Sequence, residues 1–448
     1  MNCGYNFARL TYNHSYSMSE IKQVNKNALT FIIITLIIDC TGLGLIIPVI
    51  PNLISELTNQ TPSESALYAG YLSFSYAIMQ FLFAPVMGNL SDKYGRRPLI
   101  LLSLFGLGLD YLFLAIAPTI TLIFVGRIIS GIFGASFTTA SAYIADVSPP
   151  DKRAQNFGLI GVAFGVGFIL GPAIGGIFAQ FGTRIPFVIA ACLSLTNVIY
   201  GYFVLPESLP KSKRRPFDWR RANPIGAVVE IRKFKGLGWL LLSVALLDIA
   251  GMATQSTWTF YTMFKFEWNT AMVGISLAVV GVLIAFVQGF LIRIITPRIG
   301  EKKSVIYGYI IYIISFILIG LVTQGWMLYI VMSAYALGGI CGPALQSLIS
   351  NKVSDDSQGE LQGIFSSMMS IAEIIGPLFM TELFYLFTKE STKFLFPGAP
   401  FIAAAAISVV ALFIIINPLN QMTDSIHELP IEENEENQPS SGSRVIAE

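Results

Sequence analysis

Twelve stretches of mostly apolar residues divide the chain, and short polar segments separate them. Each stretch reaches the roughly 20 residues that a helix needs to cross the hydrocarbon core of a bilayer. The stretches lack the apolar–polar alternation of a transmembrane β-strand and are too long for one. The pattern predicts an all-α membrane protein with twelve transmembrane helices. The predicted spans are 28–55, 66–88, 98–117, 119–145, 154–180, 185–205, 237–262, 270–296, 301–322, 325–350, 358–387 and 394–417.

The composition agrees with this pattern. Charged residues make up 12% of the chain, against about 25% in a typical soluble domain. The net charge of +1 does not favour electrostatic binding of a nucleic acid. The four cysteines lie far apart, and the two histidines fall outside the predicted spans. We therefore expect no disulfide framework, metal site or cofactor, and no nucleophile–base pair of an enzyme stands out.

The basic residues predict the orientation in the membrane. If the N-terminus is cytoplasmic, 22 of the 28 lysines and arginines lie in cytoplasmic segments and four in outside segments. Such an excess of positive charge on one side is typical of cytoplasmic loops. We expect both termini in the cytoplasm and the protein in the inner (plasma) membrane of a cell.

A charged segment divides six spans from six spans. Residues 206–236 hold nine basic residues, and we interpret them as a solvated cytoplasmic linker in preference to a lipid or nucleic-acid patch. The predicted units are an N-terminal tail (1–27), a first six-helix half (28–205), the linker, a second half (237–417) and an acidic tail (418–448). The last tail is expected to be disordered.

The two halves carry a weak internal repeat. Gly95 follows the second span, and Gly300 follows the eighth at an offset of 205 residues. At this offset Asp92 aligns with Pro297, so the second copy lacks the acid. Two related halves with pseudo-two-fold symmetry are typical of secondary transporters, whose substrate sites lie between repeats near mid-membrane.

Six charged residues fall inside the predicted spans, where each costs at least ~2.5 kcal/mol on insertion scales. Most lie near mid-depth. Burial favours the protonated form of a carboxyl group, and proton coupling needs such a group. Each residue can also serve a structural hydrogen bond, and the arginine can form an internal ion pair with an aspartate. The six are Asp39, Asp110, Arg127, Asp248, Glu373 and Glu382.

The segment between the second and third spans follows the pattern Gly-x3-Asp-Lys-x-Gly-Arg-Arg and predicts a tight polar turn. Gly88 is expected to allow close packing, and Gly95 a conformation closed to residues with a Cβ atom. Its four charges come from Asp92, Lys93, Arg96 and Arg97. We predict a cytoplasmic gate in which Asp92 pairs with an arginine or helix end across the gate in the outward-open state. An ordinary basic loop is the alternative.

Two spans contain residues that bend or closely pack helices. In the first span, Pro48 and Pro51 predict a bent helix whose freed carbonyls line a cavity. The fifth span has small residues at four-residue spacing around a kink at Pro172, which predicts a groove for close helix approach. These small residues are Gly161, Gly165, Gly171 and Gly175.

These motifs resemble those of the major facilitator superfamily, and within it the drug–proton antiporters with twelve spans. Gly88 to Arg97 is similar to the superfamily's loop motif. Ile123 to Gly131 resembles its fourth-span motif, which implies a role in proton coupling for Arg127. The fifth span resembles a motif typical of antiporters at Gly167, Gly171, Pro172, Gly175 and Gly176.

Residues 28–417 also resemble the bacterial tetracycline efflux proteins, for example at Asp110-Tyr111. That family has an essential acid in its ninth span and a histidine in its eighth. By position these correspond to Tyr312 and Ile284, neither of which titrates near neutral pH, since a tyrosine ionises near ~10. Asp248 and Glu373 are candidates to replace the two coupling groups.

The sequence therefore predicts a proton-coupled antiporter that exports an amphipathic, drug-like molecule by alternating access. Its expected partners are this substrate, protons and the lipid bilayer, and one chain holding both halves predicts a monomer. A transporter of an endogenous metabolite or siderophore, a membrane-bound enzyme and a non-transporting receptor or scaffold are alternatives. Four aromatic residues either line an amphipathic pocket or pack the bundle: Tyr71, Phe74, Trp258 and Tyr261.

Overall fold

The computed structural model describes residues 18–134, 136–149, 153–219, 237–353 and 358–421. Within these ranges it contains twelve helical segments long and apolar enough to cross a membrane, and no strand. The predicted all-α fold of twelve transmembrane helices is confirmed. Most of the two predicted tails and residues 220–236 of the predicted linker lie outside the described residues.

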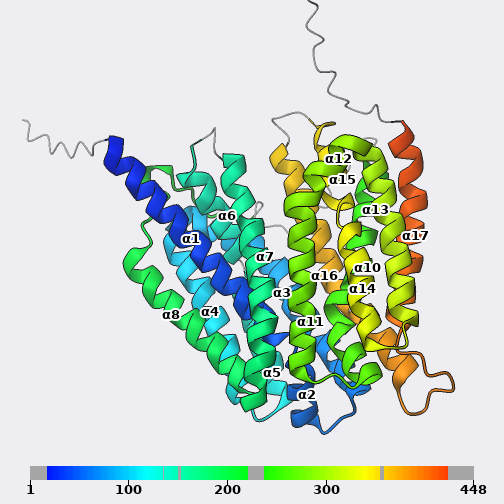
Figure 1. The fold of residues 1–448 in the computed structure, drawn as a ribbon. Helices are drawn as coiled ribbons and strands as arrows, with labels where there is room; N and C mark the ends of the chain where they lie inside the picture. The colour runs from blue at the N-terminus through cyan, green and yellow to red at the C-terminus, as the bar shows by residue number, and fades with distance from the viewer. Residues whose placement is uncertain (1–17, 135, 150–152, 220–236, 354–357, 422–448) are drawn as a thin grey trace, which may run out of the picture.

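The spans form two bundles that stand side by side in Figure 1. The first bundle contains α1 (Met18–Ile46), α3 (Pro62–Tyr94), α4 (Arg96–Ile116), α5 (Ile120–Phe133) with α6 (Ser136–Val147), α7 (Arg153–Phe178) and α8 (Ile185–Val204). The second contains α10 (Gly238–Phe266), α11 (Thr270–Phe286) with α12 (Ile292–Ile299), α13 (Glu301–Leu321), α14 (Gly325–Gly338) with α15 (Cys341–Ser350), α16 (Gln358–Thr388) and α17 (Ala399–Asn420).

The first predicted span is broken where the sequence predicts a bend. Helix α1 ends at Ile46, and the chain resumes as a short helix, α2 (Ile50–Thr58). Pro48 lies in the break and Pro51 in the first turn of α2, positions that tolerate the missing N–H of proline. The proline pair therefore ends one helix and begins another.

The halves repeat in structure at the offset seen in the sequence. Helices α4 and α13 each contain 21 residues and begin at Arg96 and Glu301, 205 positions apart. Gly95 and Gly300, which precede them, have φ of 110° and 82° with ψ of 159° and 158°. Residues with a Cβ atom rarely adopt such positive φ values. The weak sequence repeat thus encodes a repeated backbone turn.

Helix α7 packs closely on α1 in its own half. A Cβ atom added to Gly167 would lie 2.8 Å from the Thr41 nitrogen, and one on Gly171 would lie 2.8 Å from the Gly44 Cα. A Cβ atom on Gly175 would collide with the carbonyl of Leu45. Small residues let the two backbones approach this closely.

The opposite side of α7 faces α11 of the second half over part of its length. A Cβ atom on Gly176 would lie 2.8 Å from the Thr270 carbonyl oxygen. Helical spacing places Gly161 and Gly165 on this same side, but no atom lies within 4 Å of a Cβ position there. The predicted groove is therefore wrong at Gly161 and Gly165 in this conformation, because α7 and α11 part toward that end.

The two ends of the molecule differ. Both described chain ends and the Gly88–Arg97 loop lie at one face of the molecule, at the top of Figure 1, which we call the terminal face. This face is predicted to be cytoplasmic. Near the opposite face Asn52 Nδ2 donates to Thr270 Oγ1 (2.9 Å), and Ser63 Oγ donates to the Thr388 carbonyl (3.1 Å). These bonds join the halves. The halves are thus held together near the opposite face, and α7 and α11 part toward the terminal face.

We predict that Gly175→Ala lowers the stability of the protein by roughly 1–3 kcal/mol, the usual cost of overpacking a close contact. Thermal unfolding of the purified protein in detergent measures this change. Gly165→Ala is the matched control, since it adds the same methyl group to the same helix in open space. Equal losses in the two variants would contradict the packing of α7 on α1.

Candidate functional site

A buried ion pair lies inside the first half. Arg127 Nη2 on α5 lies 2.6 Å from Asp110 Oδ2 on α4, and the Asp110 side chain is fully buried. Gly126 leaves room for the contact, since a Cβ atom there would lie 3.1 Å from Asp110 Oδ1. A charged side chain within the hydrocarbon core needs a partner of opposite charge. Asp110 and Arg127 are such partners for each other. The structure thus contains the internal arginine–aspartate pair that the sequence left open.

Asp39 and two tyrosines surround this pair. Asp39 on α1 is 2% exposed. Tyr111 on α4 lies close enough to Asp39, Asp110 and Arg127 for their charges to act on its hydroxyl. The ring of Tyr76 on α3 lies 6.0 Å from the Arg127 guanidinium, at the limit of a cation–π contact. Three of the predicted residues, from three different spans, therefore share one neighbourhood.

The second half contributes two acids. Asp248 on α10 and Glu373 on α16 are close enough for their charges to interact, and both side chains are partly exposed. Gly251, one turn beyond Asp248, has no atom within 4 Å of a Cβ position. Helix α10 therefore borders open space at the depth of Asp248.

Tyr76 lies between the two groups of charges. Its hydroxyl is close enough to interact with Glu373 of the second half and with Arg127, Asp110 and Asp39 of the first. The structure thus brings the five predicted coupling residues into two groups that are linked by one tyrosine. Glu382 stands apart, because nine residues of helix separate it from Glu373 by about 13 Å.

The sequence pattern pointed to charged residues within the spans and to four aromatic residues, but not to Tyr76 or Gln288. Gln288 lies in a π-helical turn, Val287–Leu291, between α11 and α12. Its side chain is exposed, and its amide nitrogen lies 3.8 Å from the Cβ position of Gly339, where the tenth span breaks. Such turns are frequent at functional sites. The sequence signal that could have identified Gln288 is its uncharged amide within an otherwise apolar span.

Two of the four candidate aromatic residues belong to the packed core. Trp258 and Tyr261 on α10 are at most 1% exposed. Trp258 Nε1 donates to Ser276 Oγ (3.0 Å), and the Tyr261 hydroxyl donates to the Ile319 carbonyl. Tyr71 is 43% exposed. For Trp258 and Tyr261, packing of the bundle is therefore the correct alternative.

The segment Gly88–Arg97, for which we keep the name Gly88–Arg97 loop, is helical on both sides of a one-residue turn at Gly95, because α3 continues to Tyr94 and α4 begins at Arg96. It is stabilised from within the first half. The Arg96 guanidinium lies 2.6 Å from Asp92 and 3.3 Å from Asp146 of α6. Arg97 Nη2 donates to the carbonyl of Tyr202 at the end of α8. Gly88 has no close neighbour, since the nearest atom to its Cβ position is 3.9 Å away, so its expected close packing is wrong here. The pairing of Asp92 across the gate concerns the other access state and stays a prediction.

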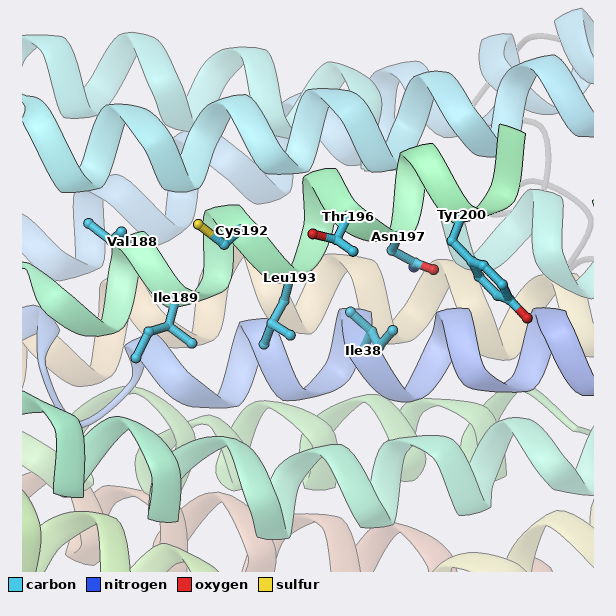
Figure 2. A pocket seen from close by; sticks show the side chains of 8 residues that line it. All are labelled: Ile38, Val188, Ile189, Cys192, Leu193, Thr196, Asn197 and Tyr200. Carbon is cyan, nitrogen blue, oxygen red and sulfur yellow. The ribbon is translucent and has the colours of Figure 1, made fainter. Parts of the chain in front are cut away.

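Two cavities lie away from the predicted coupling residues. A groove of about 370 Å³ between α1 and α8 is lined mostly by apolar side chains, including Leu193, and by Asn197 (Figure 2). A second cavity of about 330 Å³ lies between the halves near the opposite face, beside Asn52 and Trp268. Neither is lined by a predicted coupling residue. Among the residues that the structure describes, no three His, Cys, Asp or Glu side chains are grouped to hold a metal ion.

Comparison with known proteins assigns this arrangement to a family. The sequence profile of the Major Facilitator Superfamily matches residues 32–377 and 290–429. The chain belongs to this superfamily. The class C tetracycline resistance protein of Escherichia coli is 37% identical over 388 residues, which cover 87% of this chain and 96% of that protein. The class B protein of Escherichia coli is 36% identical over 81% of this chain and 89% of its own.

A solved structure shares the fold. The crystal structure of the human organic anion transporter MFSD10 aligns with a TM-score of 0.68 at 23% identity, over 87% of this chain and 99% of that chain. The predicted membership of the major facilitator superfamily, in a group with the tetracycline resistance proteins, is confirmed. This major facilitator protein is a multi-pass membrane transporter, which fits the expectation that it is not an enzyme.

We predict that Asp110→Asn destabilises the protein by roughly 3–5 kcal/mol, because it leaves the Arg127 charge buried without its partner. Thermal unfolding in detergent measures the loss. The double variant Asp110→Asn/Arg127→Gln removes both charges and should recover most of the stability. A double variant no more stable than the single one would argue against the pair.

Proposed function

We propose that this transporter is a proton-coupled antiporter that exports an amphipathic small molecule by alternating access. The observation that carries the proposal is the position of the acids. Asp248 and Glu373 are partly exposed, and their charges interact. The Tyr76 hydroxyl is within electrostatic reach of Glu373 and of the charged group of the first half. Titratable groups from both halves thus meet between the bundles, as in transporters whose site lies at the repeat interface.

The balance of charge favours a cationic group on the substrate. Arg127 is already neutralised by Asp110 at 2.6 Å. Asp248 and Glu373, in contrast, are close enough for their charges to interact, and two carboxylates within such reach attract protons or a cation. A proton and a cationic substrate then compete for the same acids, which is the exchange that antiport requires.

The neighbourhood of Tyr312 supports a transfer of the coupling role. Tyr312 on α13 stands where the tetracycline efflux proteins are expected to have an essential acid. Asp248 on α10 is close enough to Tyr312 for its charge to act on the tyrosine hydroxyl. An acid contributed by the seventh span therefore lies beside the position where the ninth span lacks one. We infer that Asp248, with Glu373, takes over the coupling.

The conformation supports alternating access. The halves are joined at Asn52–Thr270 near the opposite face, while α7 borders open space at Gly161 and Gly165. With the terminal face in the cytoplasm, this is the state that admits substrate from inside the cell. We further propose an inner-membrane location with both termini inside, and a monomer as the working unit.

We predict that Glu373→Gln and Asp248→Asn each lower proton-driven transport at least roughly tenfold, as expected when a group acting in the rate-limiting exchange is lost. Everted membrane vesicles, with tetracycline and the cationic dye ethidium as probes, measure the initial rate. Glu382→Gln is the matched control on the same helix and should transport normally. Normal rates in both test variants would remove these acids from the mechanism.

Locking the opposite face should stop the cycle. We expect a disulfide between cysteines at Asn52 and Thr270 to abolish transport and dithiothreitol to restore it, because the outward-open state requires this contact to part. The exposed Cys192 is first replaced by serine. Full transport by the oxidised protein would contradict alternating access at this contact.

A further inference from the structure

The start of the linker contacts the loop of the first half at the beginning of α4. The Arg96 N–H donates to Glu207 Oε1 (2.8 Å), and the Leu209 N–H donates to the same oxygen (3.0 Å). Arg214 Nη2 lies 3.6 Å from Glu207 Oε2. An acid at the first turn of a helix satisfies an unpaired N–H and complements the helix dipole. A Cβ atom on Gly95 would collide with the Glu207 carboxylate, so the turn and the acid fit each other.

A second set of contacts holds the other side of the loop. The Arg215 N–H donates to the carbonyl of Asp92 (3.1 Å). Asn89 Nδ2 donates to the Asp218 carbonyl, and the Asp218 N–H donates to Asn89 Oδ1 (3.5 Å). Asn89 is only 8% exposed. The chain from Glu207 to Asp218 therefore runs beside the loop and bonds to both of its ends.

The same segment is also tied to α6. The Tyr143 hydroxyl donates to the Pro206 carbonyl (3.0 Å), and Ser208 Oγ donates to Asp146 Oδ2 (3.0 Å). Asp146 is also the acid that pairs with Arg96 at 3.3 Å. These partners belong to the first half. Most residues of the described first part of the linker are exposed, but this part is fixed to the first half by these contacts.

Among the residues that the structure describes, no segment covers the equivalent turn in the second half. Gly300 adopts the same backbone conformation as Gly95, yet no atom lies within 4 Å of its Cβ position. The first residue of α13, Glu301, accepts a hydrogen bond from Ser347 Oγ of its own bundle (2.6 Å) instead. The fold repeats the turn, but within the described part of the chain only the first half adds a segment over it.

We propose that residues 205–218, the loop strap, are a fixed part of the Gly88–Arg97 loop, and that Glu207 is the positioning residue that holds Asp92 and Arg96 in place. The strap stays on the loop in both access states. Its contacts join parts of the first half, so a movement of the two halves as rigid bodies leaves them intact. The inference rests on these contacts and not on the substrate or on proton coupling.

The first test measures the loop without transport. In Glu207→Gln, hydrogen exchange at the amides of residues 95–97 should rise roughly tenfold, the ratio that corresponds to about 1.4 kcal/mol. Glu207→Asp should keep part of the protection, because it preserves the charge. Ser212→Ala, an exposed change within the strap, is the control and should exchange like the parent. Unchanged exchange in Glu207→Gln would overturn the positioning role, whether or not the proposed antiport is correct.

The second test asks whether the strap ever leaves the loop. Cysteines at Asn89 and Asp218, in the protein with Cys192→Ser, are oxidised to a disulfide. Transport of tetracycline in vesicles should be equal before and after oxidation. Hydrogen exchange along α7 and α11, which needs no substrate, should likewise stay the same. If oxidation lowers transport or changes this hydrogen exchange, and dithiothreitol reverses the effect, the strap must detach during the cycle. Either result would overturn the proposal.

Discussion

The close contact of α7 with its two neighbours is the constraint on which the arrangement of the halves depends. Gly171 and Gly175 bring the backbone of α7 against α1, and Gly176 brings it against α11 of the other half. Lipid supplies no hydrophobic drive between helices, so association rests on close van der Waals packing. One helix therefore belongs firmly to the first bundle and also touches the second. It is the natural pivot about which the bundles can open.

The apolar surroundings of the membrane also constrain the charged residues. Asp110 and Arg127 neutralise each other within the first half, so their pairing accounts for their presence without any transport. Asp248 and Glu373 are instead partly exposed, and the charge that each brings within reach of the other is also negative. Placing an ionisable side chain within the hydrocarbon core costs free energy, so such residues usually mark a functional site. In the proposed antiport mechanism, the second half therefore supplies the exchangeable acids.

The symmetry of the fold does not extend to its loops. Gly95 and Gly300 form the same turn, since both positions need a backbone that only glycine adopts readily. The turn at Gly95 carries an ion-pair network and lies under the strap, whereas no described residue covers the turn at Gly300. Structural repeats thus preserve the path of the backbone, while the side chains that fix each loop differ between the halves.

The sequence by itself determined the twelve spans and the two glycine turns, because bilayer thickness and the steric limits of a Cβ atom act on local segments. It also showed which charges lie within the spans, although only Asp39 and Asp110 of the six are buried. It did not determine that Arg127 pairs with Asp110, that Gly161 and Gly165 face open space, or that Glu207 caps α4. Each of these depends on how close residues distant in sequence come when helices pack. Only the tertiary structure decides that, because packing sets the distances over which charges and hydrogen bonds act.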